Sequence, residues 1–142
     1  MPLFRRGAEV EPRSLDDLIV EAKAFVERNR PNLEPDEDFV PTVLTDGRKG
    51  PELHALALPG GALEKALQKI ARKSERFVFW ATAWQAEGVD SPDVRAYEHP
   101  ERFEAVVIQA AEPESGREEL WRAKLDRVPN APPRLGDWER MG

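Results

Sequence analysis

The sequence contains no cysteine, which excludes a disulfide, a thiol nucleophile and a cysteine-ligated metal site. It also has no apolar run near the roughly 20 residues that a membrane-spanning helix requires. The first residues, MPLFRRGAEVEP, lack the apolar core of a secretory signal. Together these absences favour a cytoplasmic protein that has no membrane partner.

The sequence signatures of common catalytic sites are also missing. The chain has no GxxxxGK[ST] phosphate loop, no GxGxxG, no HExxH and no GxSxG. Its few serines are not flanked as a nucleophilic serine would be. The sequence therefore indicates no catalytic residue, no metal ligand and no cofactor, and it favours a protein without enzyme activity.

Composition and charge set the class of protein. With 142 residues, 40% of them apolar and 34% charged, the chain has the size and composition of one soluble globular domain. A net charge of −6 argues against general nucleic-acid binding, because phosphate contacts need a clustered positive surface. The richness in Arg, Glu and Pro is typical of thermophiles and also of a GC-rich genome. We expect residues 1–142 to form a single domain, in which 1–13 and 129–142 are loose terminal segments.

The most informative stretch is residues 76–87, RFVFWATAWQAE, because apolar side chains occupy both of its alternating faces. A strand that is exposed on one side alternates apolar with polar residues, so this strand should be covered on both sides, at the centre of a sheet. Phe77 and Phe79 point one way, and Trp80 and Trp84 point the other. The pattern predicts the core of the protein, but it does not identify a chemistry.

The remaining elements can be placed around this strand. Ser14 is a good N-cap, apolar residues recur at helical spacing from Leu15 to Val26, and Pro31 ends the helix. A second helix is predicted for about residues 62–74. The other predicted strands cover residues 39–45, in which Pro41 suggests an edge strand, 53–58, 103–111 and 118–128. The order α-β-β-α-β-β-β indicates an α+β fold, an antiparallel sheet of about five strands with both helices on one face.

Four residues are candidate binding residues: Trp84, Trp121, Arg102 and Glu104. If the helices cover one face of the sheet, tryptophans on the other face would form an exposed aromatic patch of the kind found at interfaces. Arg102 and Glu104 share a strand face, where they could bind a ligand or simply form an ion pair. These residues favour a non-catalytic binding or protein-interaction module. Its partner would be another protein or a second copy in a homodimer, joined through the aromatic face or an edge strand.

A small metal- or carboxylate-dependent hydrolase is the first alternative. Glu52 and His54 are two positions apart on one strand face, where a carboxylate and an imidazole could share a metal. The site would need Asp46, Glu104 or His99 to converge with them in space. An exposed ion pair on a hairpin strand is the simpler interpretation.

Nucleic-acid contact through the helix of residues 62–76 is the second alternative. Its basic stripe consists of Lys65, Lys69, Arg72, Lys73 and Arg76. A dense positive face can contact nucleic acid or an acidic partner. Cations near a helix C-terminus are also favoured by the helix dipole, so a solvated face explains the same pattern.

One segment resembles a known pattern. ATAW (81–84) at the end of one strand, followed by HPERFEAVVI (99–108) at the start of the next, is similar to bacterial and phage proteins that have no assigned function. The resemblance covers the central third of the chain. It implies an accessory role in a phage or mobile element, and it assigns no activity and no functional residue.

Overall fold

The computed structural model describes residues 14–46, 50–85 and 102–142. The predicted loose arm at 1–13 and the candidate residue His99 lie outside the described residues. Within the described ranges, neither helix is long and apolar enough to cross a membrane. In chain order the elements are α2 (Leu15–Asn29), η1 (Arg30–Asn32), β1 (Thr42–Asp46), β2 (Glu52–Ala55), α3 (Gly60–Lys73), β3 (Arg76–Gln85), β4 (Phe103–Glu112), β5 (Arg117–Asp126) and β6 (Arg134–Arg140).

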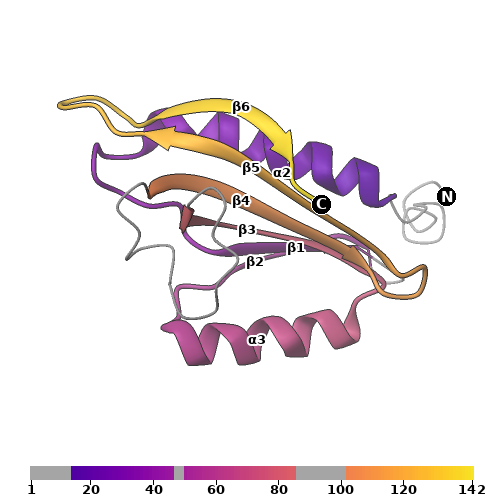
Figure 1. Cartoon of the computed structure of the whole chain (residues 1–142). Coiled ribbons are helices and arrows are strands. Elements are labelled where there is room, and N and C mark those ends of the chain that lie inside the picture. Colours follow the sequence, from indigo (N-terminus) through magenta and orange to yellow (C-terminus); the bar gives the residue numbers. More distant parts are fainter. Residues whose placement is uncertain (1–13, 47–49, 86–101) are drawn as a thin grey trace, which may run out of the picture.

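The strands form one antiparallel sheet in the order β2-β1-β3-β4-β5-β6 (Figure 1). The predicted α+β class and antiparallel meander are confirmed, with six strands rather than about five. β3 lies at the centre of the sheet, as its two apolar faces predicted, and its Trp80 pairs with Ile108 of β4. The Pro41 segment is not the edge of the sheet. Pro41 lies just before β1, and β2 occupies the edge.

Helix α2 begins with a capping box. The Ser14 Oγ accepts the Asp17 N–H at 3.1 Å, and the Asp17 carboxylate accepts the Ser14 N–H at 3.2 Å, so backbone donors at the helix start are satisfied. Apolar residues at helical spacing then face the sheet. Phe25 and Trp80 are in ring contact, with centroids 5.2 Å apart. The core beneath α2 contains Leu15, Leu18, Ile19, Ala22 and Val26 together with Leu44, Val78, Trp80, Val106, Ile108, Ala110 and Leu125.

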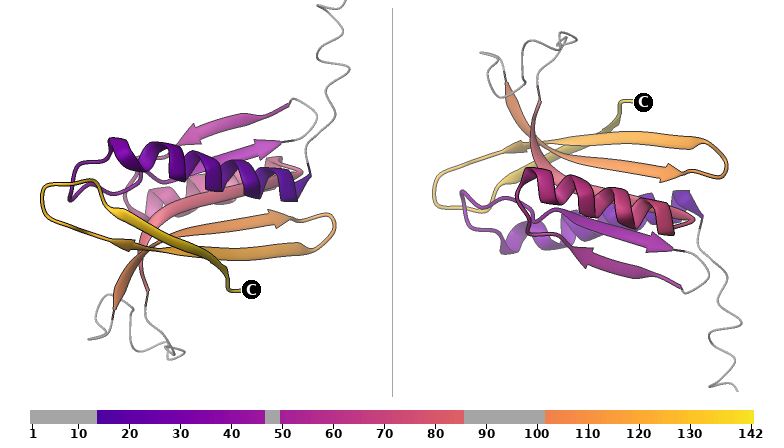
Figure 2. Two further views of the ribbon diagram at one scale, coloured as in Figure 1. Left: turned by 90° about the horizontal axis from the view of Figure 1, so that it is seen from above. Right: turned by 90° about the horizontal axis from the view of Figure 1, so that it is seen from below.

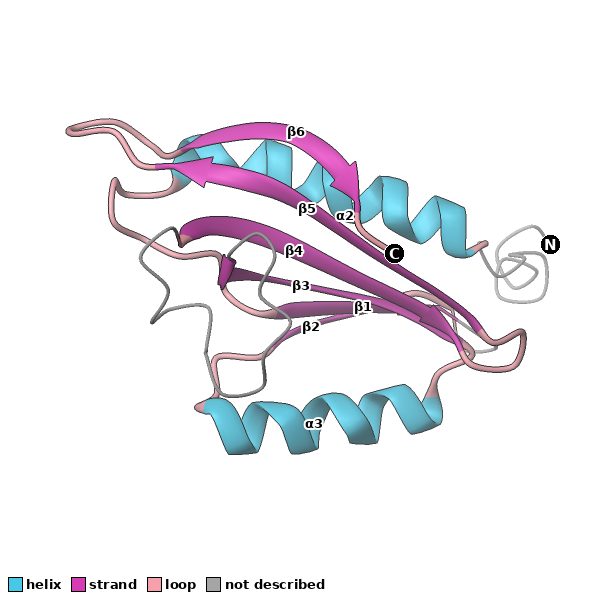
Figure 3. Cartoon of the chain, in the orientation of Figure 1, coloured by secondary structure: helices cyan, strands magenta, loops and turns pink. Residues whose placement is uncertain are grey.

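The two helices lie on opposite faces of the sheet, so the prediction that both cover one face is wrong (Figures 2 and 3). The strand residues confirm what the views show. Leu44 packs in the core beneath α2, whereas the next residue, Thr45, lines a cavity with Ile70 of α3. Successive residues of a strand point to opposite faces. β3 is apolar on both faces: Val78 and Trp80 are fully buried on the α2 side, whereas Phe77 and Phe79 on the α3 side are half-buried.

Strand β6 forms within residues 129–142, which the sequence analysis placed in a loose terminal segment. Its pairing with β5 contains an irregularity between Ala123 and Leu125. Leu125 pairs with Leu135 and Ala123 with Trp138, so β6 has one more residue than β5 between the two pairs. The extra residue turns both Leu135 and Trp138 toward the core, where they pack as half-buried side chains.

Candidate binding surface

Three of the four predicted binding residues meet at one end of β3 and β4. Trp84 pairs across the strands with Glu104, and its side chain is 42% exposed. The guanidinium carbon of Arg102 lies 4.9 Å from the centroid of the Trp84 ring. Arg102 therefore covers one side of the tryptophan in a cation–π contact and does not pair with Glu104.

Glu104 pairs with a different arginine, Arg127. Its carboxylate accepts hydrogen bonds from Arg127 at 2.8 and 3.0 Å, and Arg127 also donates to Asp38 and to the carbonyls of Pro35 and Glu37. The hydrogen bond to Glu104 holds the pKa of Arg127 above its usual value. This network ties the segment before β1 to the end of β5. Glu104 is thus part of a structural ion pair.

Trp121 lies apart from these three residues. It pairs with Ile108, four positions along β4 from Glu104, and it is half-buried on the face that α2 covers. The Lys23 ammonium lies 3.3 Å from the centroid of the Trp121 ring, and the indole N–H donates to Glu119 at 3.1 Å. The predicted aromatic patch on a helix-free face does not exist in the described residues, because Trp80, Trp84 and Trp121 all point toward the α2 side.

Glu119 anchors α2 to the sheet. It is buried, it pairs with Arg117, and Arg117 also pairs with Asp16 in the first turn of α2. Burial raises the pKa of Glu119, but the hydrogen bonds from Arg117 and Trp121 outweigh burial and lower the pKa overall. The same arginine lowers the pKa of Asp16. These charges hold the helix in place and are not free for a ligand.

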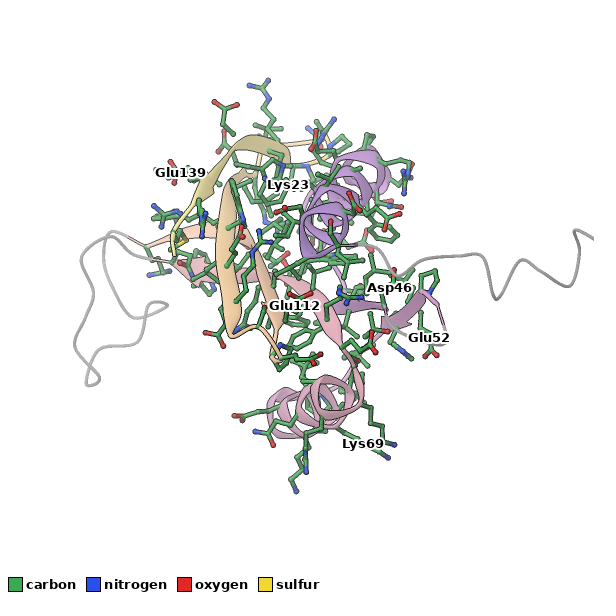
Figure 4. All side chains as sticks on the ribbon, turned by 90° about the vertical axis from the view of Figure 1, so that its right-hand side faces the viewer. Lys23, Asp46, Glu52, Lys69, Glu112 and Glu139 are labelled. Carbon is green, nitrogen blue, oxygen red and sulfur yellow. The ribbon has the colours of Figure 1, made fainter. Side chains whose placement is uncertain are left out.

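A cavity of about 630 Å³ lies between α3 and the β1–β2 hairpin. In Figure 4, Glu52 of β2 and Lys69 of α3 lie on the same side of the molecule. Ala66 and Ile70 of α3 form the apolar part of the wall. The other lining residues are Thr45, Asp46, Gly50, Glu52, His54, Lys69, Lys73, Ser74 and Glu75.

Some of the charged side chains around this cavity form ion pairs and others do not. His54 Nε2 lies 3.3 Å from the Glu52 carboxylate, with both side chains exposed, which is the surface pair that their spacing predicted. The Glu75 carboxylate lies 3.7 Å from the guanidinium of Arg76. Within the described residues, Lys69 and Lys73 form no ion pair.

The described residues do not bring together the set that the hydrolase alternative requires. Asp46 pairs with Arg76 at one end of β3, while Glu104 pairs with Trp84 at the other end. Among the described residues there is no group of three or more His, Asp or Glu side chains that could hold a metal ion. Glu52 and His54 therefore remain a pair.

The sequence predicted an edge strand at residues 39–45, but the edge of the sheet next to β1 is β2. Within residues 14–46, 50–85 and 102–142, no strand pairs with the outer edge of β2. Leu53 on this strand is 53% exposed, and Val40 and Leu58, which flank the hairpin, are 47% and 44% exposed. The signal in the sequence was the short apolar segment LHALAL between two prolines. Such a segment does not reveal which of its sides faces solvent.

Comparisons with protein-family models, with curated proteins and with solved structures give no match for this chain.

Proposed function

We propose that this protein is a non-catalytic interaction module that binds its partner along the outer edge of β2. The observation that supports the proposal is the exposed apolar side chain of Leu53 on β2, with further exposed apolar residues next to the hairpin in the sequence. Leu53 is 53% exposed, and Val40 before β1 and Leu58 after β2 are 47% and 44% exposed. A partner that covered them would remove apolar surface from water, which is worth about 25 cal/mol per Å².

The two edges of the sheet differ in a way that supports the same surface. The edge strand β6 exposes charged side chains, Arg134, Asp137, Glu139 and Arg140, and it contains an irregularity in its pairing. Charges and bulges are the features by which edge strands avoid pairing with other chains. β2 exposes Leu53 on one face and the Glu52–His54 pair on the other. An added strand would therefore find apolar contact on one face of β2, whereas β6 exposes charges.

A matched pair of surface substitutions tests the proposal. Leu53→Lys places a charge on the proposed surface, and Val20→Lys places the same charge on α2, where Val20 is 65% exposed. We expect the mass in solution to rise with concentration, or a protein partner to copurify, in the wild type and in Val20→Lys. Leu53→Lys should abolish either behaviour. A strict monomer without any copurifying partner would contradict the proposal.

One observation favours a second function, contact with nucleic acid through α3. The side chains of Lys65, Lys69, Arg72 and Lys73 are all exposed on this helix, whereas Arg76 is held by Glu112 at 3.0 Å. If this surface binds nucleic acid, the affinity should fall steeply with salt concentration because counterions are released on binding. Lys69→Glu combined with Arg72→Glu should abolish the binding. An affinity that does not depend on salt would contradict this second function.

A further inference from the structure

The partner that fits the outer edge of β2 best is a second copy of the same strand. We infer that two chains pair through β2 in an antiparallel ladder, with the two-fold axis between the Leu53 residues of the two chains. This inference rests on the proposed function, because it names the occupant of the same surface. It joins the two sheets into one continuous sheet, and it makes the interface self-complementary, as a two-fold interface must be.

The backbone of β2 has the right groups on its outer side. The Leu56 N–H donates to the carbonyl of Pro41, the residue opposite it in the hairpin, at 2.7 Å. Directly opposed residues of an antiparallel pair alternate between hydrogen-bonded and non-hydrogen-bonded positions. His54 and Glu52 therefore turn their backbone groups toward β1. The backbone N–H and C=O groups of Leu53 and Ala55 point outward, toward solvent.

These outward groups favour one register. With Leu53 opposite the partner's Leu53, each leucine donates its N–H to the carbonyl of the other. Ala55 then donates to the carbonyl of the partner's Pro51, and Pro51 loses nothing because it has no N–H to satisfy. A seam centred on Pro51 would have no donor at its centre. The prolines before and after the strand, Pro51 and Pro59, limit the ladder to this short segment.

The side chains favour the same register. In this register Glu52 lies opposite the partner's His54, and by symmetry His54 lies opposite the partner's Glu52. An acidic and a basic residue that face each other across a pair of strands stabilise the pairing. A seam centred on Ala55 would instead set His54 opposite the partner's Leu56. On the other face of the sheet, the exposed Leu53 side chains of the two copies contact each other at the axis.

A charge-exchange experiment tests this register. His54→Glu sets two carboxylates opposite each other across the seam, and the double variant Glu52→Lys with His54→Lys sets two ammonium groups opposite each other. We expect each variant alone to associate at least about tenfold more weakly than the wild type. An equimolar mixture of the two variants sets opposite charges face to face and should restore the dimer. Glu64→Lys, on an exposed position of α3, is the control and should leave association unchanged.

Sedimentation velocity over a range of concentrations separates the outcomes, with circular dichroism to check that each variant is folded. Association to twice the chain mass of 16.1 kDa that is lost in each variant and restored in the mixture supports the inference. A dimer that persists in both variants overturns the register but leaves an interaction module in place. A wild type that stays monomeric at every concentration overturns the second copy as the occupant. The proposed function then stands only if a copurifying partner is lost in Leu53→Lys.

Discussion

Helices α2 and α3 have nearly the same length, 15 and 14 residues, and they lie on opposite faces of one sheet. α2 buries five of its residues and is held further by its ion pair to β5 and by the hydrogen bond from the Trp138 indole to Glu27 at 3.2 Å. Every residue of α3 is half-buried or exposed. Two helices with similar apolar stripes therefore differ in how firmly they are fixed.

The difference follows from what each helix faces. α2 lies over large apolar side chains from several strands, among them Val78, Trp80 and Ile108, which are fully buried. α3 lies beside the short β1–β2 hairpin, where Thr45 and the Glu52–His54 pair border a cavity. One side of the sheet thus fixes the fold. The other side is covered less fully, and it adjoins the edge at which we propose that a partner binds.

The largest difference in the free energy of unfolding is expected between substitutions of two tryptophans on the same face of β3. Trp80 is 1% exposed beneath α2, and Trp84 is 42% exposed at the end of the strand. We expect Trp80→Ala to lower the free energy of unfolding by about 3–5 kcal/mol, because it removes a large buried side chain. Trp84→Ala should cost about 1 kcal/mol, since it removes a surface cation–π contact with Arg102. Urea unfolding measures both, and equal losses would contradict the comparison.

Matched leucines on the two helices provide the next test. Leu18 of α2 is fully buried and Leu67 of α3 is half-buried. We expect Leu18→Ala to cost about 2–5 kcal/mol. Leu67→Ala should cost about 1 kcal/mol, because less apolar area leaves water at its site on folding. A loss at Leu67 as large as that at Leu18 would show that α3 is packed as firmly as α2.

The charges that anchor α2 predict a dependence on pH. The folded-state pKa of Glu119 lies below the usual value of 4.5, so its contribution to stability is complete above about pH 4.5 and is lost as the pH falls through the lowered pKa. Glu119→Gln should cost about 1–3 kcal/mol at pH 7. It should also flatten the decline of stability in acid. Glu118→Gln, at the exposed neighbouring position, is the control, and chemical unfolding from pH 7 to pH 3 is the measurement.

The smallest effect on stability is expected at β2. In dilute solution Leu53→Lys should change the free energy of unfolding by less than about 0.5 kcal/mol, because the side chain is exposed. The same substitution should nevertheless abolish association. A large loss of stability in dilute solution would mean that Leu53 supports the fold of the single chain and is not held at the surface for a partner.

Local patterns in the sequence predicted the main elements. Ser14 and Pro31 mark the limits of α2, and apolar residues on both faces of residues 76–85 give β3 and its central position. β6 was missed because it follows a proline-rich segment and because its apolar residues, Leu135 and Trp138, are three positions apart. In a regular strand that spacing puts them on opposite faces, and the bulge that brings them together is a property of the pairing with β5.

The proposed binding surface was harder to predict because it depends on contacts between distant segments. Contacts between strands bury Arg122, which is 8% exposed and pairs with Glu139 of β6 at 3.0 Å. Glu104 was expected to pair with Arg102 or to bind a ligand, but it forms an ion pair with Arg127 instead. The prominence of Leu53 follows from the strand order, which makes β2 an edge. No pattern within residues 53–58 contains that information.

The most direct test of the binding surface is the hydrogen exchange of backbone amides in β2, measured by NMR at low and high protein concentration. The His54 N–H, which faces β1, should be protected at both concentrations. The Leu53 N–H, which faces outward, should exchange rapidly in dilute solution and at least about tenfold more slowly when the chains associate. Association that leaves the exchange of Leu53 unchanged would contradict the account, because the partner would then bind somewhere other than the outer edge of β2.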